Sequence, residues 1–285
     1  MGDLHYSLDE RAEVQSARDN WYRAILDRFL AEDADFHVAL GDLTHHGTPP
    51  EWERLWDLVS ILQVNRRSDF SFVLGNHDTL GWTKRELERW SRQPRYFMQE
   101  GTDWRLVWLD TTKQASRQDW GGEVDAQQLR WLQGVVKGRV KTTLLLGHHP
   151  FPNTTTKSAD VMMSIDNAEE LTAALASLGP DTVYCNGHNH VNSLVRAYPD
   201  KRDSSWRNPT WTYVQCGAPL SCGTYCVLEV TGEGVKLETR VLGSDISAMA
   251  RHLVVNINGY MDEFVTAADA DLSLFVPRLD GDVAL

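Results

Sequence analysis

The spacing of apolar residues in the first part of the chain predicts an amphipathic helix. Residues 9–31 place Trp21, Ile25 and Phe29 on one face, as expected when one side of a helix packs on a core. The same kind of spacing recurs later in the chain, after polar or proline-containing segments. Further helices are predicted at residues 48–63, 126–137 and 167–179.

Short apolar runs lie between these helices and predict β-strands. One of them is FHVALGD at residues 36–42, and each such run ends at a glycine or at a residue type that binds metal ions. Because strands and helices alternate through the middle of the chain, we expect an α/β fold with largely parallel strands. The other runs in this part lie at residues 69–76, 95–99, 104–110, 141–149 and 181–187.

Beyond residue 207 the pattern changes to consecutive strands. Runs at residues 210–217, 223–230 and 234–242 follow one another, and Thr-Gly-Glu-Gly forms a hairpin turn between the last two. No linker, repeat or low-complexity segment interrupts the sequence, so we expect residues 1–243 to form one domain. Residues 244–285 are expected to be a C-terminal extension that packs on this domain or mediates oligomerisation.

Composition and charge narrow the class of protein. The chain is 42% hydrophobic and 24% charged, and its formal net charge is −12. We expect no stable binding of nucleic acid, because such binding needs a basic face. No apolar run approaches the roughly 20 residues that cross a bilayer, and residues 1–30 are unlike a signal peptide. We therefore expect no membrane partner and, by default, a cytoplasmic location in which the four cysteines stay reduced.

Residues of the types that bind metal ions follow the apolar runs. The carboxyl ends of strands in open α/β sheets converge on one crevice, so side chains that are distant in sequence can meet there. Unrelated polar loop tips are the alternative, but such loops would not be restricted to these residue types. The motifs are Asp-Leu-His at 3–5, Gly-Asp at 41–42, Gly-Asn-His-Asp at 75–78, Gly-His-His-Pro at 147–150 and Gly-His-Asn-His at 187–190.

The chemistry of these side chains indicates divalent metal ions. Carboxylate, amide oxygen and imidazole together suit Mn, Fe, Zn, Co or Ni. A thiolate zinc site is disfavoured because only Cys185 lies near the motifs. The candidate ligands are too numerous for one ion with open positions, and they would fill two sites if one carboxylate bridges them. Two ions about 3.5–4 Å apart can clamp a phosphate group and activate a water molecule.

The five motifs, in this order, resemble the signature of the calcineurin-like metallophosphoesterase superfamily. The resemblance covers residues 1 to about 230. It implies an α/β fold built as a four-layer αββα sandwich of two mixed sheets flanked by helices. It also implies two divalent metal ions, with Asp42 bridging: Asp3, His5, Asp42 and His190 hold the first, and Asp42, Asn76, His148 and His188 hold the second.

The implied activity is metal-dependent hydrolysis of a small phosphodiester or phosphomonoester by attack of a metal-bound hydroxide. His77 resembles a histidine that lies beside the metals and stabilises the phosphate or protonates the leaving alkoxide. General acid catalysis of this kind contributes roughly 10²–10⁴-fold, and Asp78 is expected to hold His77 charged. His148 is favoured over His149 as the ligand because the family's ligand stands two residues before the proline. His45 and His149 are expected to contact substrate or support the ligands.

Departures from the signature separate branches of the superfamily. Protein phosphatases have Asp-Arg-Gly after Gly-Asp and an arginine where Leu74 stands, and purple acid phosphatases have a tyrosine where His45 stands. The chain looks more similar to bacterial cyclic-nucleotide and glycerophosphodiester phosphodiesterases. A 3′,5′-cyclic-nucleotide phosphodiesterase is therefore the narrower alternative. A non-catalytic scaffold of the same fold is a further alternative, whereas the acidic composition argues against a nuclease.

The N-terminal motif departs from the family in one respect. Asp-x-His follows a full apolar strand in the family, whereas only Met1 and Gly2 precede Asp3 here. We therefore expect a truncated first strand. Asp3 and His5 are expected to lie on a frayed terminus, which would weaken the first metal site.

Overall fold

A computed structural model describes residues 1–64, 66, 68–113, 116–137, 142–196, 211–254 and 274–277. Within these ranges, no helix combines the length and the apolar character needed to cross a membrane. The helices are α1 (Ala12–Leu30), α2 (Pro49–Gln63), α3 (Lys84–Ser91), α4 (Ala126–Val135), α5 (Ala168–Ala174), α6 (Pro219–Cys222) and α7 (Ser244–Val254).

The strands in the described part of the chain form three hydrogen-bonded sheets. A six-stranded sheet has the order β3-β4-β5-β6-β8-β7; its two edge strands, β3 and β7, are antiparallel to their neighbours and its central strands are parallel. β1 and β2 pair in parallel, and β9, β10 and β11 pair antiparallel. The bounds are β1 (Phe36–Leu40), β2 (Asp69–Val73), β3 (Phe97–Glu100), β4 (Trp104–Trp108), β5 (Thr142–Leu146), β6 (Thr182–Asn186), β7 (Ser193–Arg196), β8 (Thr212–Gln215), β9 (Thr224–Thr231), β10 (Gly234–Val241) and β11 (Leu274–Pro277).

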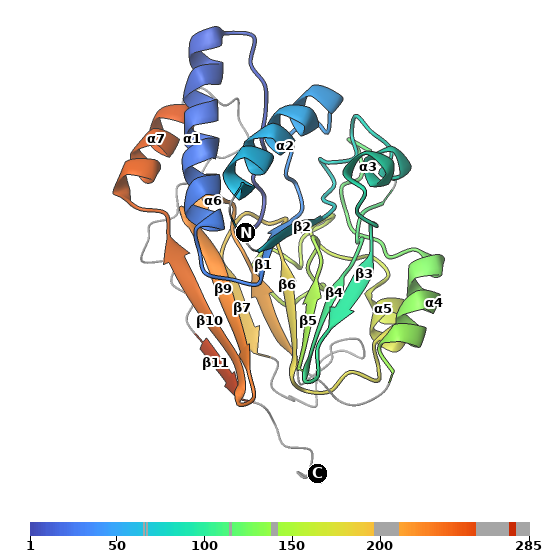
Figure 1. Cartoon of the computed structure of the whole chain (residues 1–285). Helices are drawn as coiled ribbons and strands as arrows, with labels where there is room; N and C mark the ends of the chain where they lie inside the picture. Colours follow the sequence, from blue (N-terminus) through green and yellow to red (C-terminus); the bar gives the residue numbers. More distant parts are fainter. Residues whose placement is uncertain are drawn as a thin grey trace.

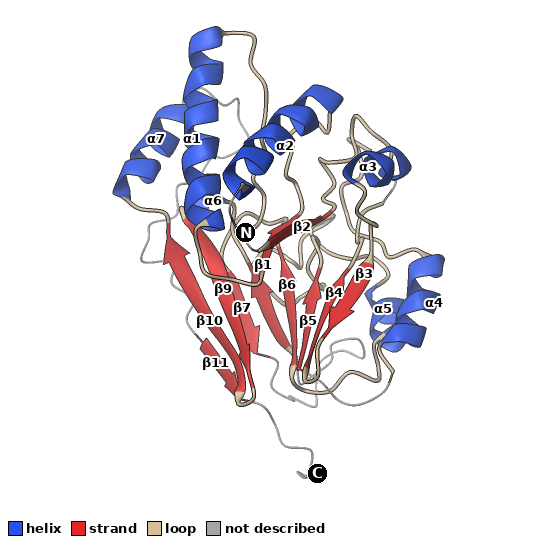
Figure 2. Cartoon of the chain, viewed as in Figure 1, coloured by secondary structure: helices blue, strands red, loops and turns tan. Residues whose placement is uncertain are grey.

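Three apolar cores separate four layers of secondary structure (Figures 1 and 2). The first core lies between helices α1, α2 and α7 and a β layer, and it contains Trp21 and Ala39. The second core lies between the two β layers and contains Leu40 and Leu146. The third core, between the six-stranded sheet and helices α4 and α5, contains Leu145. Neighbouring residues of one strand thus face opposite cores, and the expected four-layer αββα sandwich is confirmed.

The β layer beneath α1 and α2 is built from two sheets. Ala39 of β1 and Tyr225 of β9 both face the first core, whereas Leu40 of β1 and Val235 of β10 both face the second. The pair β1–β2 and the group β9–β10–β11 therefore share one layer although they are separate hydrogen-bonded sheets.

The N-terminal segment is hydrogen-bonded alongside β1 instead of fraying. The terminal amine of Met1 donates to the carbonyl of Val38 at 3.0 Å, and Leu40 donates its N–H to the carbonyl of Met1 at 2.8 Å. Farther along, the N–H of His5 donates to the carbonyl of Asp42 at 2.8 Å. Met1 is only 4% exposed. The expectation of a frayed terminus is wrong because backbone pairing and burial both fix this segment.

Most helices and strands lie where the apolar pattern predicts them. α5 ends earlier than the predicted 167–179 helix, and the chain turns directly after it. Four short elements, α3, α6, β7 and β11, were not predicted. α3 has the sequence KRELERWS, in which Leu87 is the buried residue, so it carries almost no apolar pattern to recognise.

The start of the C-terminal region packs on the domain. Ile246 and Ala250 of α7 belong to the first core, and α7 lies beside α1 in Figure 1. β11 adds an antiparallel strand to β10. The rest of the expected extension, residues 255–273 and 278–285, lies outside the described residues. The boundary at residue 243 stays a prediction.

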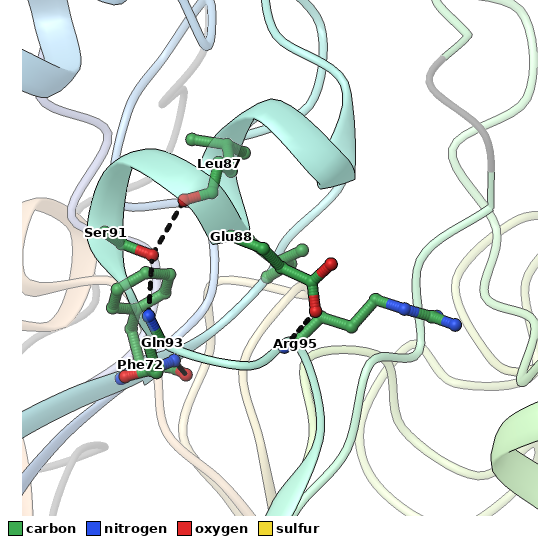
Figure 3. A pocket seen from close by; sticks show the side chains of 7 residues that line it. Phe72, Leu87, Glu88, Ser91, Gln93 and Arg95 are labelled. Atoms are coloured by element: carbon green, nitrogen blue, oxygen red, sulfur yellow. Dashed lines mark hydrogen bonds between the residues drawn. The ribbon is translucent and has the colours of Figure 1, made fainter.

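The side chain of Gln93 covers the outer edge of β2 and forms the backbone hydrogen bonds that a neighbouring strand would form (Figure 3). The Gln93 amide donates to the carbonyl of Phe72 at 2.7 Å and accepts from its N–H at 3.1 Å. Glu88 accepts from the N–H of Arg95 at 2.9 Å and so fixes the chain that leaves α3. This arrangement protects an edge that would otherwise offer unpaired backbone groups. The small pocket drawn there contains no residue of the five motifs; it is lined by Phe72, Leu74, Leu87, Glu88, Ser91, Gln93 and Arg95.

Candidate metal centre

The side chains of the five motifs converge where β1, β2, β5 and β6 end. Asp42 and Asn76 follow strands of one β layer, whereas His148 and His188 follow strands of the other. The centre therefore lies across the carboxyl ends of both layers, as expected for a site in an α/β fold. Ligand atoms lie within 4.8 Å of one another in three clusters: Asp3, His5, Asp42 and His190; His148, His149 and His188; and His5, His45 and His77.

The backbone of the predicted ligands is strained. Non-glycine residues with a left-handed backbone cost roughly 1–3 kcal/mol each and gather at functional sites. Five of the seven predicted ligands have φ between 47° and 72°, namely Asp3, His5, Asp42, His188 and His190. The fold therefore directs these side chains into the centre at the expense of stability.

Two glycines of the motifs allow ligands from different loops to approach one another. A Cβ on Gly75 would overlap the carboxylate of Asp42, and a Cβ on Gly187 would overlap the carboxylate of Asp3. Each glycine thus makes room for a ligand that belongs to another motif. This contact explains why glycine precedes Asn76 and His188 in the sequence.

We call Asn76, His148 and His188 the inner group. His148 donates its Nδ1–H to the carbonyl of Leu40 at 2.8 Å, and His188 donates its Nε2–H to the carbonyl of Met162 at 3.0 Å. These bonds leave Nε2 of His148 and Nδ1 of His188 facing each other at 3.2 Å, and the Asn76 Oδ1 lies 3.1 Å from the same Nε2. The carbonyl partners thus orient both imidazoles toward one point.

We call Asp3, His5 and His190 the outer group. The Nε2 atoms of His5 and His190 lie 3.0 Å apart, and Asp3 Oδ1 lies 3.6 Å from His190 Nε2. The Asp3 carboxylate also accepts the N–H of His188 at 2.9 Å, which joins this group to the inner one. The side chain of His190 is 22% exposed, whereas that of His148 is fully buried. Each group thus has one half-buried ligand, His190 in the outer group and Asn76 in the inner group, whereas the remaining ligands are buried.

Asp42 lies between the two groups. Its Oδ2 is 3.4 Å from His148 Nε2 and 3.7 Å from His5 Nε2. Its Oδ1 accepts the N–H of His77 at 2.8 Å. One carboxylate oxygen thus faces an imidazole from each group, which is the placement that a bridging ligand requires.

The arrangement of nitrogen atoms fits metal ions. Two imidazole lone pairs that face each other at about 3 Å repel unless a cation or a proton lies between them. Burial lowers the pKa of His188 to about 3 and that of His190 to about 4, so both present lone pairs at neutral pH. Burial also acts to lower the pKa of His148, but the carboxylates of Asp42 and Asp3 outweigh it and raise the pKa to about 9. A proton on His148 thus takes the place of a cation, and the donor set suits divalent metals.

His77 lies beside the centre on the Asn76 loop. Its Nδ1–H donates to the carbonyl of His45 at 2.6 Å, so its Nε2 is turned the other way. Its ring packs edge-on against that of His5, with the centroids 4.7 Å apart. The expected pairing with Asp78 is wrong: the Asp78 carboxylate accepts from Thr44 at 3.0 Å and from the N–H of Gly75 at 2.9 Å. Asp78 thus fixes the two loops that carry Asp42 and Asn76.

His45 and His149, which were expected to contact substrate or support the ligands, differ in their surroundings. His45 Nδ1 lies 3.4 Å from Nδ1 of His5, on the side of that ring away from Asp42. His149 accepts from the Thr111 hydroxyl at Nδ1, at 2.9 Å, and donates from Nε2 to the carbonyl of Trp120 at 3.0 Å. Both nitrogens of His149 are therefore engaged, which favours His148 as the ligand of this pair.

Three residues that support the centre were not identified from the sequence. Thr111 accepts the N–H groups of His148 and His149 through its hydroxyl at 3.2 and 3.1 Å. Trp120 and Met162 act through their carbonyl oxygens, which the side-chain type does not reveal. The Leu-Asp-Thr-Thr run at residues 109–112 was a usable signal for Thr111, because it follows a strand as the ligand motifs do.

Comparison with known proteins agrees with this geometry. The model of the calcineurin-like phosphoesterase family matches residues 1–192. A probable cyclic nucleotide phosphodiesterase of Synechococcus sp. is 31% identical over 153 residues, which is 52% of this chain and 55% of that protein. The chain thus spans about half the length of this curated relative.

Solved structures show the same fold. A dimetal phosphatase from Danio rerio has a TM-score of 0.65 and 14% identity, over 85% of this chain and 95% of that one. A 5′-nucleotidase from Candida albicans has a TM-score of 0.52 and 15% identity, over 90% of this chain and 57% of that one. At these identities the likeness concerns the fold alone.

Proposed function

Since the chain belongs to the calcineurin-like phosphoesterase family, we propose that it hydrolyses a small phosphodiester or phosphomonoester with the help of two divalent metal ions. The observation that carries the proposal is the pairwise facing of imidazole nitrogens around Asp42, at 3.0 and 3.2 Å. Such pairs need a cation or a proton between the two nitrogens, and they suit two ions that share one carboxylate.

In this proposal the outer group and Asp42 hold one ion, and the inner group and Asp42 hold the other. Bound ions would polarise the phosphoryl oxygens and supply an activated water nucleophile. The chain has a net charge of −12 and would repel an anionic ester, so the cations would also reverse the local field. The donor types favour Mn, Fe, Zn, Co or Ni and do not select one of these metals.

His77 is the proposed general acid. Its Nδ1–H is fixed on the carbonyl of His45, so Nε2 is the atom that can give a proton to the leaving oxygen or bind a phosphoryl oxygen. The N–H of His77 is held by Asp42, which keeps the imidazole beside the metal ligands. Asp78 and His149 are positioning residues in this scheme, and His45 supports His5 from behind.

The test is hydrolysis of bis(p-nitrophenyl) phosphate and p-nitrophenyl phosphate with added Mn, Zn, Ni or Mg. We expect activity that depends on the added ion, disappears with a chelator and returns when the ion is restored. Asp42→Asn should be inactive while keeping a cooperative melting transition. Protein that binds two ions but hydrolyses neither ester would overturn the proposal in favour of a non-catalytic scaffold.

A 3′,5′-cyclic-nucleotide phosphodiesterase is the second candidate, favoured by the name of the Synechococcus relative. Release of nucleoside monophosphate from cyclic AMP or cyclic GMP would support it. Hydrolysis of the nitrophenyl esters without cyclic-nucleotide turnover would reject this candidate and keep the broader one.

The four free cysteines favour a reducing compartment, so we propose the cytoplasm as the location.

A further inference from the structure

Two loops beside the inner group expose large apolar side chains. Six such side chains are exposed in the described part of the chain, and two of them, Trp120 at 37% and Val161 at 82%, lie on these loops. The loops comprise residues 116–122 and 153–164, and neither carries a predicted metal ligand. Exposed apolar residues that gather near a functional centre indicate a binding surface.

The backbones of both loops are hydrogen-bonded to histidines of the centre. The carbonyl of Trp120 accepts from His149 Nε2, and the carbonyl of Met162 accepts from His188 Nε2, each at 3.0 Å. The ring centroids of His149 and His188 are 4.4 Å apart, so the two carbonyls accept from neighbouring imidazoles. The loops that carry Trp120 and Val161 therefore pack against the inner group.

The loops are also joined to each other. Gly122 donates its N–H to the carbonyl of Ser164 at 2.9 Å, and its own carbonyl accepts from Asp166 at 2.8 Å. A Cβ on Gly121 would lie 3.4 Å from the Cα of Met162, which shows how closely the two loops approach. Lys113 adds ion pairs with Asp119, at 2.7 Å, and with Asp166. The two loops that carry Trp120 and Val161 are thus held against each other.

The second loop is held in place by buried amides. Asn189 and Gln215 donate to the carbonyl of Thr156 at 3.1 and 3.2 Å, and Met162 has a left-handed φ of 63°. The exposed side chain of Val161 adds nothing to the stability of the fold, although the loop that carries it is strained and held in place. A ligand that covers the side chain gives the arrangement a physical reason.

We propose that Trp120 and Val161 bind the organic part of the phosphoester and select esters that carry a flat aromatic group, such as a nucleobase. This inference rests on the proposed function, because the phosphate would occupy the metal centre while the organic part extends over the two loops. An indole ring stacks on any base face, and an aliphatic side chain contacts the same flat surface. Small aliphatic esters would gain nothing from either residue.

The test compares two ligands that differ only in the base. Methylene phosphonate analogues of adenosine 5′-monophosphate and of ribose 5-phosphate cannot be hydrolysed, so calorimetry on Mn²⁺-loaded protein measures binding alone. We expect the adenosine ligand to bind at least about tenfold more tightly, the order of effect of one base–aromatic stack. Trp120→Ala should abolish this preference by lowering the affinity for the adenosine ligand far more than that for the ribose ligand. Trp120→Phe should keep most of it.

Matched controls come from exposed apolar residues elsewhere. Ile61 and Val64 are 59% and 67% exposed. They lie at the C-terminal end of α2, whereas the Gly-Asp motif at 41–42 precedes its N-terminal end. Val161→Asp should lower the affinity for the adenosine ligand, whereas Val64→Asp and Ile61→Ala should not. Equal affinities of the wild type for both ligands, or an equal loss of both in Trp120→Ala, would overturn the inference. Absence of ester hydrolysis would instead count against the proposed function, since binding is measured separately.

Discussion

The inner and outer groups of the centre use similar ligands but differ in how the fold supports them. His148 and His188 each donate to a backbone carbonyl, of Leu40 and Met162, so the inner imidazoles are oriented before any ion binds. In the outer group, His5 has another imidazole, His45, against its Nδ1, and the side chain of His190 is 22% exposed. The inner imidazoles are thus oriented by backbone carbonyls of separate loops, whereas His5 contacts a neighbouring side chain.

This difference indicates a division of labour between the two groups. A preorganised set of ligands retains its ion, because little ordering entropy opposes binding. A set of ligands that is supported less rigidly exchanges its ion faster. Because the N–H of His5 is bonded to the carbonyl of Asp42, we expect any weakness of the outer group to come from ligand support and not from a loose terminus.

Removing one ligand from each group gives the largest expected effect. Asp3→Asn should leave about one ion per chain and lower activity at least about 10³-fold, because an ion contributes several kcal/mol to the transition state. Asn76→Ala should keep both ions at a higher metal concentration, since His148 and His188 stay anchored. Elemental analysis after dialysis measures both. If Asn76→Ala loses its ion more readily than Asp3→Asn, the comparison of the groups is wrong.

His77→Ala should lower kcat by roughly 10²–10⁴-fold while both ions stay bound, because His77 lies beside the ligands and acts on the leaving group. The loss should be larger for an alkyl ester than for a nitrophenyl ester, whose leaving group needs little protonation. Loss of an ion together with activity would show that His77 is a ligand.

Thr111→Val tests the support of the inner group. The hydroxyl accepts the N–H groups of His148 and His149, so its removal should lower inner-site metal affinity by about 10–100-fold. Thr142→Val is the control, since Thr142 is buried at the start of β5 and its hydroxyl lacks a hydrogen-bond partner among the described residues. Equal metal affinities of the two variants in a competition titration would show that Thr111 does not support the inner group.

His190 of the outer group and His148 of the inner group should change stability with pH in opposite directions in metal-free protein. Burial lowers the pKa of His190 to about 4, so the unfolded chain binds more protons and stability falls as pH drops from about 6.5 toward 4. The pKa of His148 is raised to about 9, because Asp42 and Asp3 outweigh burial. Its stabilising contribution is therefore full below about 6.5 and disappears as pH rises through 9.

Single substitutions isolate these contributions. Melting temperatures in a chelator should show that His190→Gln flattens the acid side of the pH profile and that His148→Gln flattens the alkaline side. Each change should amount to a few degrees. Profiles that shift in parallel with the wild type would contradict the assigned protonation states.

The sequence predicted the parts of the centre that depend on local pattern. Asp42, Asn76, His148 and His188 each follow an apolar run, and the ends of neighbouring strands must meet, so their convergence could be inferred. Asp78 was assigned to the wrong partner because its orientation depends on the N–H groups of Thr44 and Gly75, which only the folded turn brings together.

The supporting carbonyls could not be predicted for a related reason. Met162 and Trp120 contribute backbone oxygens, and any residue type has one. The short strand β7 and helix α3 were missed because they are too brief or too polar to show a period. Their positions depend on tertiary contacts, such as the antiparallel pairing of β7 with β8.

The most direct test of the two-ion centre is a calorimetric titration of metal-free protein with Mn²⁺, with ester hydrolysis measured on the same samples. We predict about two ions per chain, bound in two steps, with activity appearing only as the second ion binds. Asp42→Asn should bind neither ion tightly, because Asp42 faces both groups. Full activity with a single ion, or an unchanged stoichiometry in Asp42→Asn, would contradict the shared two-ion centre.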